Sequence, residues 1–249
     1  MSERPIQVSR QDGITVVTLD RPPANALDPS LLSAGAEVVD ELLADPPEAV
    51  VLTGRGAFFS GGADLRVVPE LTPEDQAELT RTFNCMFSGW YQFPRPVVAA
   101  VNGHAVAGGL VLALCADHRV VGRSGRFGLT EVKVGIPFPS VAMAIVQGEL
   151  VPPVVRRLVF RAELFDSDTA MRLDLFDEQV DDDQVLDRAI AVAHELASLP
   201  RSTYEIVKKR VRIDALDRGR GQLGGAEAAA GAVAEAQQAA RKVLDARKE

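Results

Sequence analysis

The sequence contains few of the residues that cross-link a fold or hold a metal, with two cysteines and three histidines among 249 residues. Cys85 and Cys115 lie in apolar surroundings, and their spacing fits neither a disulfide framework nor a zinc site. We therefore expect both thiols to be buried as small apolar side chains. The histidines are scattered along the chain, so they lack the spacing of metal ligands.

Long apolar runs and an excess of positive charge are also missing. The longest clean apolar run, residues 105–116, is far shorter than the ~20 residues that span a bilayer. Residues 1–10 lack the basic start and apolar core of a secretory signal. The net charge of −8 argues against nucleic acid or an anionic membrane as a partner. These absences predict a reduced, cytoplasmic protein without a nucleic-acid or membrane partner.

The sequence does contain an alternation of strand-like and helix-like segments. Residues 6–19 are typical of a hairpin, and residues 49–54 of a short buried strand. Asp28 followed by Pro29 predicts the start of a helix. Strands that alternate with helices pair in parallel through right-handed crossovers. A coil of strand–strand–helix turns fits this order better than a doubly wound sheet, and no nucleotide-binding glycine motif occurs.

The last part of the sequence is helical in pattern. From about residue 139 the apolar residues follow helical spacing, which proline interrupts at residues 152–153 and at residue 200. The glycine-rich residues 217–225 predict a connector to an alanine-rich tail, residues 226–248.

Two glycine-rich loops share one pattern, FFSGGADL at residues 58–65 and NGHAVAGGL at residues 102–110. In each, a short strand leads through small residues to an expected helix start. The first N–H groups of a helix have no internal acceptor, and small residues let a ligand approach them. One N–H from each loop could together hold a developing oxyanion. For either loop alone, the simpler interpretation is that its glycines serve a tight turn and close packing of helix and strand.

Five segments of the sequence resemble, in order, motifs of the crotonase superfamily, the enoyl-CoA hydratases and isomerases: SGGADL, NGHAVAGGL, CADHRV, FGLTEVKVGIP and DLFDEQV. The resemblance covers nearly the whole chain. It implies an α/β fold with a crotonase-like ββα spiral core and a C-terminal helical region. We divide the chain accordingly into an acyl-CoA-binding core, residues 1–195, and a helical region for trimerisation or as a lid, residues 196–249. Such proteins usually assemble as trimers or as pairs of trimers, so we expect a homotrimer or a hexamer.

The resemblance also implies a binding site for an acyl-CoA substrate. The oxyanion hole would be formed by the main-chain N–H groups of Ala63 and Gly108, and it would hold the thioester oxygen. The residues implied along the CoA moiety and the acyl group are Ala24, Asn25, Ala26, Asp64, Leu65 and Gly109. For the Asp64 side chain we favour a cap on the helix expected after SGGA. The CoA thioester is itself the substrate, so the resemblance implies no separate cofactor and no metal.

One glutamate remains where hydratases of this superfamily have two. The first position is occupied by Val111, and the second is retained as Glu131. A single glutamate suits the shift of a double bond from the 3,4 to the 2,3 position, since it can remove a proton at C2 and return it at C4. We expect Leu129, Val132 and Ile136 to bury Glu131 and raise its pKa. Residue 139, where dienoyl-CoA isomerases use an aspartate, is proline.

Other interpretations of the same residues stay open. The chain could be an enoyl-CoA hydratase, or another hydrolase or lyase that uses Glu131 with water or a substrate group. Because Val111 is apolar, it could also be an acyl-CoA-binding protein without catalysis. The basic run at residues 208–210 could meet CoA phosphates, although a solvated basic face is the simpler interpretation. We interpret the acidic run at residues 181–183 as solvated surface.

Overall fold

The computed structural model describes residues 4–67 and 71–221, together with residues 238 and 245. Its larger sheet has six strands in the order β1-β2-β3-β5-β7-β9. β1 and β2 form the hairpin expected from the sequence, and all later neighbours in this sheet are parallel. The strands are β1 (Ile6–Gln11), β2 (Ile14–Leu19), β3 (Ala49–Gly54), β5 (Val97–Val101), β7 (His118–Val121) and β9 (Glu178–Gln179).

The smaller sheet consists of three short parallel strands in the order β4-β6-β8. They are β4 (Phe58–Ser60), β6 (His104–Val106) and β8 (Phe127–Gly128). Each follows a strand of the larger sheet along the chain, and a helix comes after each. This repeated strand–strand–helix turn is the ββα spiral, so the predicted fold class is confirmed.

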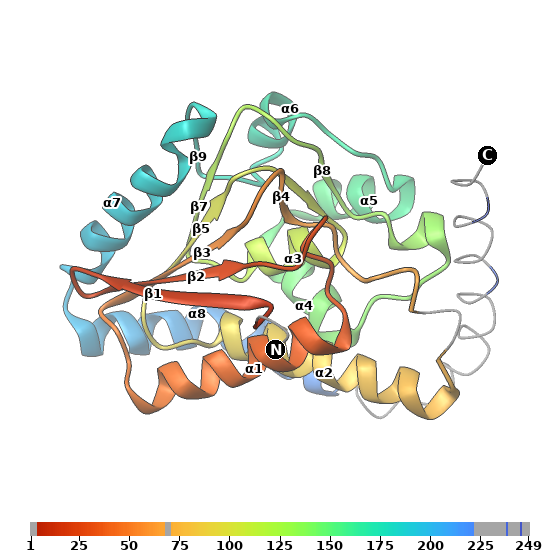
Figure 1. Cartoon of the computed structure of the whole chain (residues 1–249), viewed down its shortest axis with the longest axis horizontal. Helices are drawn as coiled ribbons and strands as arrows, with labels where there is room; N and C mark the ends of the chain where they lie inside the picture. The colour runs from red at the N-terminus through yellow and green to blue at the C-terminus, as the bar shows by residue number, and fades with distance from the viewer. Residues whose placement is uncertain (1–3, 68–70, 222–237, 239–244, 246–249) are drawn as a thin grey trace.

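Helices cover both faces of the larger sheet (Figure 1). Successive residues of a strand point to opposite faces. Val51 therefore packs with α7 (Val185–Ala197), whereas Leu52 packs with α1 (Pro29–Ala44) and α2 (Pro73–Tyr91). The remaining helical elements are α3 (Gly108–Leu114), η2 (Glu131–Val134), α4 (Ser140–Glu149), α5 (Pro152–Arg161), α6 (Ser167–Arg172), η3 (Asp182–Gln184) and α8 (Arg201–Gly221).

The helix starts follow local chemistry. The Asp28 carboxylate accepts a hydrogen bond of 2.9 Å from the Leu31 N–H and caps α1, as predicted. The predicted glycine-rich connector is wrong for residues 217–221, which form the last part of α8. The reason is close packing: a Cβ atom at Gly219 would lie 3.0 Å from the Val141 Cα of α4.

The rest of that connector, residues 222–225, lies outside the described residues, as does the tail at 226–248 apart from residues 238 and 245. The boundary expected at residue 196 falls at the end of α7. The division into two regions stays a prediction.

The two cysteines differ in burial. Cys115 is buried, as expected, and burial raises the pKa of its thiol. The prediction for Cys85 is wrong, because its side chain is exposed. It lies on α2, where Met86 and Phe87 occupy the inward face and are almost completely buried. The helical period therefore turns the residue before them toward solvent.

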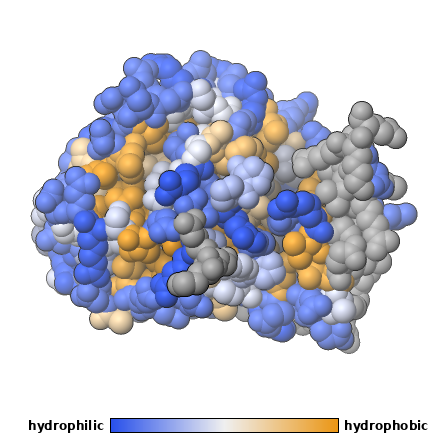
Figure 2. All heavy atoms as spheres, viewed as in Figure 1, coloured by the Kyte–Doolittle hydropathy of each residue, from blue (hydrophilic) through white to orange (hydrophobic). Residues whose placement is uncertain are grey.

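In Figure 2, which has the same view as Figure 1, polar side chains cover most of the visible face. Figure 2 shows apolar side chains reaching this surface in patches, including one between α7 and the β1–β2 hairpin. Among the described helices, none is long and apolar enough to cross a membrane.

Candidate active site

The carboxyl ends of the three strands of the smaller sheet meet at one edge. β4 ends at Ser60, β6 at Val106 and β8 at Gly128, and the parallel register pairs Val106 with Gly128. Loops that follow the carboxyl ends of neighbouring parallel strands converge, which is where α/β proteins place their ligands. The loops that begin at Gly61, Ala107 and Leu129 therefore share one location. These are the two glycine-rich loops of the sequence and the segment that contains Glu131.

Direct contacts join these loops. The Ala107 N–H donates a hydrogen bond of 2.8 Å to the Gly128 carbonyl. A Cβ atom at Gly62 would lie 2.7 Å from the Ala107 Cβ and 3.0 Å from the Gly108 nitrogen. Gly62 also has a φ of +78°, which disfavours any residue with a side chain. This position therefore needs glycine for both its space and its conformation.

The N-terminus of α3 presents unpaired main-chain donors. Ala107 precedes it with φ 53° and ψ −128°, a strained conformation for a residue other than glycine, of a kind that clusters at functional sites. Neither the Gly108 N–H nor the Ala63 N–H donates a hydrogen bond to any residue that the structure describes. The two predicted oxyanion donors thus both lie on loops at this edge, and neither has an acceptor among the described residues.

The helix expected after the first loop falls partly outside the described residues: residues 65–67 form a turn, and residues 68–70 are not described. The cap predicted for Asp64 therefore stays a prediction. The Asp64 carboxylate accepts a hydrogen bond of 3.0 Å from the Arg66 N–H and pairs with the Arg66 guanidinium, which lowers the pKa of Asp64. An aspartate can bond the backbone two residues on, so it stabilises a turn as readily as a helix start.

The predicted CoA loop is fastened to β4 beside the first glycine loop. The Asn25 side-chain amide donates to the Phe58 carbonyl at 2.7 Å, and the Ser60 hydroxyl donates to the Asn25 carbonyl at 2.8 Å. The Gly61 N–H donates to the Ala24 carbonyl, also at 2.8 Å. Asn25 is almost completely buried, so its side chain holds the loop together. Contacts of Ala24, Asn25 and Ala26 with CoA stay predictions.

Glu131 is a buried acid with one unpaired oxygen. It begins η2 and is 7% exposed. Burial raises its pKa to about 7, although main-chain N–H groups of residues 130 and 131 stabilise the carboxylate. The Oε2 atom is buried and has no hydrogen-bond partner among the described residues. A buried carboxyl oxygen without a partner is costly, and such costs mark candidate functional sites.

The surroundings of Glu131 agree with the prediction in part. Leu129 is fully buried, whereas Val132 is 54% exposed. The prediction for Val132 is wrong because η2 is a 3₁₀ helix, in which successive residues point about 120° apart. With Glu131 pointing inward, Val132 points toward solvent. Ile136 is half-buried, and its N–H donates to the Glu131 carbonyl at 3.0 Å.

Apolar side chains surround the Gly108 donor. A Cβ atom at Gly108 would lie 3.1 Å from Leu27 Cδ1, 3.6 Å from Phe87 Cζ and 3.7 Å from Phe83 Cε1. Val111, on the first turn of α3, is 1% exposed. Hydrogen bonds to a ligand in such surroundings meet little competition from water.

Two open hollows of the surface lie elsewhere. One, between β1 and α1, measures about 480 Å³. The other, between α4, α5 and α8, measures about 550 Å³ and includes Phe160 and Arg218. Neither is lined by Ala63, Gly108 or Glu131. The candidate site is thus defined by its free donors and its acid.

Sequence reasoning missed a buried ionic cluster. Lys208 was interpreted as part of a solvated face, yet it is 8% exposed and lies 2.6 Å from the Asp117 carboxylate. Arg212, one turn later on α8, bonds the same carboxylate at 3.0 Å. The sequence feature that could have revealed this cluster is the helical spacing of four residues that all face inward: Lys208, Arg212, Ala215 and Gly219.

The acidic run at residues 181–183 agrees with its interpretation as surface. Asp181 pairs with Arg123, and Asp182 accepts hydrogen bonds from Ser124. Within the part of the chain that the structure describes, no group of three His, Cys, Asp or Glu side chains could hold a metal ion.

Known proteins resemble this chain over most of its length. A family model described as enoyl-CoA hydratase/isomerase matches residues 9–243. A probable enoyl-CoA hydratase of Mycobacterium avium is 33% identical over 204 residues, which cover 82% of this chain and 79% of the relative.

Solved structures give the same result. A protein of Mycobacterium tuberculosis is described as an enoyl-CoA isomerase in one solved structure and as a probable enoyl-CoA hydratase in another. In the first it is 32% identical with a TM-score of 0.85, over 92% of this chain and 99% of that one. Human mitochondrial Δ3-Δ2-enoyl-CoA isomerase has a TM-score of 0.91 over 98% of both chains, and at 23% identity it shows a shared fold. With the spiral fold and the family match over residues 9–243, the chain belongs to the enoyl-CoA hydratase/isomerase family of the crotonase superfamily.

Proposed function

We propose that this enzyme shifts the double bond of a 3-enoyl-CoA to give a 2-enoyl-CoA. The proposal is supported by the buried acid Glu131, whose Oε2 atom has no partner among the described residues. Its segment follows the same edge of the smaller sheet as the loops of Ala63 and Gly108, whose N–H groups have no acceptor among those residues. Substrates of the family are acyl-CoA thioesters, and the thioester carbonyl needs such donors when C2 loses a proton. The reaction needs no cofactor, since the CoA thioester is itself the substrate.

Glu131 acts first as a base and then as an acid. Its carboxylate removes a proton from C2, and the electron pair moves onto the thioester oxygen to form a dienolate. The Ala63 and Gly108 N–H groups hold that oxyanion. The carboxylic acid then returns the proton to C4, which leaves the double bond between C2 and C3 and restores the carboxylate. A pKa of about 7 suits both steps near neutral pH.

Val111 favours isomerisation over hydration. Adding water across a double bond requires a positioned water and a proton for C2, tasks that two carboxyl groups share. Val111 is apolar and almost completely buried where the second carboxyl would be. Isomerisation needs only one carboxyl group, because the proton that it removes from the substrate is the proton that it returns.

Hydration is the second candidate. Relatives in this family are mostly named hydratases, including the protein of Mycobacterium avium. The free Oε2 atom of Glu131 could accept a hydrogen bond from a water molecule. A purely binding role, or another hydrolase or lyase reaction that uses Glu131, would leave the same donors in place.

Substrate conversion distinguishes these candidates. A panel of 3-enoyl-CoA and 2-enoyl-CoA thioesters is incubated with the enzyme, and the products are identified by NMR. We expect a 3-enoyl-CoA to give the conjugated isomer, and the variant Glu131→Gln to be slower by about a thousandfold. Equal turnover by that variant would remove Glu131 from the reaction. Fast hydration of crotonyl-CoA would favour the hydratase, and binding measured by calorimetry without any turnover would favour the binding role.

We further propose that the enzyme assembles as a trimer or a pair of trimers. α5 and α8 carry large apolar side chains that face solvent in the single chain: Phe160 is 73% exposed and Val211 is 75% exposed. Apolar groups that gather on a surface commonly mark an interface. A cytoplasmic location stays a prediction.

A further inference from the structure

Arg212 of α8 binds the C-terminal ends of α2 and α3. These are the helices that contain and contact the Gly108 position. Arg212 Nη1 donates to the carbonyl of Tyr91, the last residue of α2, at 2.8 Å. The same nitrogen donates at 2.9 Å to the carbonyl of Cys115, the C-cap of α3, and Nη2 donates to the next carbonyl, that of Ala116. Carbonyl groups at a helix C-terminus lack internal partners and carry negative partial charge, so one guanidinium neutralises two such ends.

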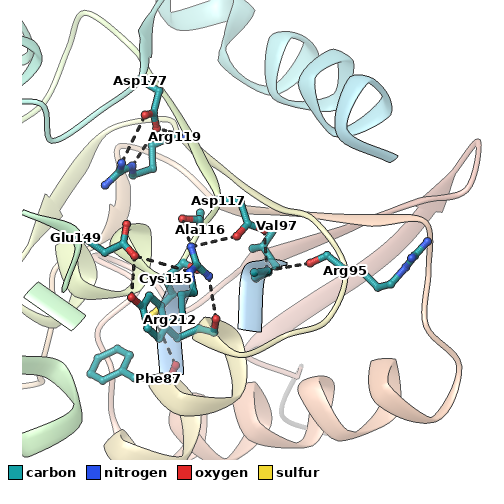
Figure 3. Close-up of polar contacts among 12 residues, drawn as sticks. Phe87, Arg95, Val97, Cys115, Ala116, Asp117, Arg119, Glu149, Asp177 and Arg212 are labelled. Atoms are coloured by element: carbon teal, nitrogen blue, oxygen red, sulfur yellow. Dashed lines mark hydrogen bonds and ion pairs between the residues drawn. The ribbon is translucent and has the colours of Figure 1, made fainter. Parts of the chain in front are cut away.

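The guanidinium is held in one orientation. It lies over the Tyr91 ring, 4.3 Å from its centroid, and Nη2 is 3.0 Å from Asp117 Oδ1. Nε is 3.7 Å from a carboxylate oxygen of Glu149 on α4. Figure 3 shows Arg212 with Cys115, Ala116, Asp117 and Glu149 around it. A planar guanidinium can make all these contacts at once, whereas the ammonium group of a lysine cannot.

Away from the ends that Arg212 binds, both helices contact the position of the Gly108 N–H: α3 begins there, and the second half of α2 packs against it. α3 has only seven residues, about 10 Å, so a tilt at Cys115 also moves Gly108. α2 places Phe83 and Phe87 against the Gly108 position. At its N-terminus α3 begins with two glycines, which add little stiffness of their own. Contacts with β4 and β8 hold the N-terminal end of α3, and the contacts of Arg212 hold its C-terminal end, so the direction of the Gly108 N–H depends on both.

We propose that Arg212 is a positioning residue for the oxyanion hole: it ties the C-terminal ends of α2 and α3 to α8 and so sets the direction of the Gly108 N–H. This inference rests on the proposed function for its kinetic effect. Arg212 itself touches no reacting atom. A misdirected donor weakens the transition state more than the bound substrate, because the negative charge on the oxygen is fully developed only there.

The variant Arg212→Lys tests the proposal, with Arg119→Lys as the matched control. Arg119 is likewise buried, and it pairs with Asp177 between β7 and β9 (Figure 3), away from α2 and α3. We expect Arg212→Lys to lower kcat for a 3-enoyl-CoA about tenfold with KM nearly unchanged, and Arg119→Lys to leave both as they are. Wild-type kcat in a folded Arg212→Lys protein would overturn the proposal.

A spectroscopic measurement separates this inference from the proposed function. Butyryl-CoA labelled with ¹³C at C1 is bound to each protein, and the infrared stretch of the thioester carbonyl is recorded. Hydrogen bonds from the hole lower this frequency, and we expect Arg212→Lys to lose about half of the wild-type shift. If the wild type shifts the carbonyl but isomerises nothing, the proposed function fails while this test still applies. An unchanged shift in Arg212→Lys would overturn the positioning role.

A second variant decides the matter if Arg212→Lys does not fold. Glu149→Gln keeps the Arg212 contacts to the helix ends and removes the charge that faces the guanidinium at 3.7 Å. The amide oxygen of glutamine can still accept the hydrogen bond of 2.8 Å that the Tyr91 hydroxyl donates to Glu149. We expect a smaller loss of the carbonyl shift in this variant, in the same direction. A wild-type shift in Glu149→Gln, with Arg212→Lys unfolded, would reduce Arg212 to a structural role and overturn the proposal.

Discussion

At the scale of single residues, chemistry depends on burial. Glu131 would be an ordinary surface acid if it were exposed, with a pKa near 4.5. In the folded chain, burial disfavours the charged form of Glu131. No hydrogen bond from the described residues to Oε2 offsets this cost. Val111 is an apolar side chain and is almost completely buried, so this position of α3 contributes no acid or base.

The pKa of Glu131 predicts the pH dependence of the reaction. The base must be ionised, and its pKa is raised to about 7, so kcat/KM for a 3-enoyl-CoA should increase about tenfold per pH unit below 7 and level off above it. A pH–rate profile of the wild type measures this limb. A profile that is flat from mildly acidic to mildly basic pH would contradict a catalytic base with this pKa.

At the scale of elements, the site is created by strand ends that lie next to each other. β4, β6 and β8 are two or three residues long, yet their parallel pairing brings three distant loops together. Glycine permits the close approach. A Cβ atom at Gly109 would lie 2.1 Å from the Ser60 carbonyl oxygen, a distance that no side chain could tolerate.

The variant Gly109→Ala should therefore disturb both stability and activity. Its methyl group would push α3 away from β4, at a cost of about 2 kcal/mol or more in the free energy of unfolding. Gly221→Ala is the matched control, since a Cβ atom there meets nothing within 4 Å. Urea unfolding and isomerase assays of both variants measure the effect. Equal stability of the two variants would show that the contact at Gly109 relaxes freely.

At the scale of the whole molecule, α8 connects the sheet, the helix ends and the exposed apolar side chains. Its inner face carries Lys208 and Arg212 to Asp117. Removing one partner from such a buried cluster costs far more than the cluster adds to stability, so it specifies where α8 docks. Its outer face carries Val211 into solvent, as α5 carries Phe160.

These exposed residues predict that assembly is sensitive to charge on α5. Phe160→Asp should convert the oligomer to smaller species, because a carboxylate at an apolar interface loses its hydration without gaining a partner. Leu43→Asp is the control, since Leu43 of α1 is also exposed, at 46%. Sedimentation velocity of the wild type and both variants gives the masses. A wild-type protein that is already monomeric would remove the proposal.

The sequence by itself determined the order of strands and helices, the cap of α1 and the family, because these depend on local patterns and ordered motifs. Only the tertiary structure decided which groups are buried or left without a partner. Asp64 bonds a turn, Lys208 points inward while its basic neighbours do not, and Glu131 keeps one oxygen free. Burial and pairing arise from contacts between residues far apart in the chain. A local pattern such as helical spacing can show which side of an element faces inward, but it does not show which partner a side chain meets there.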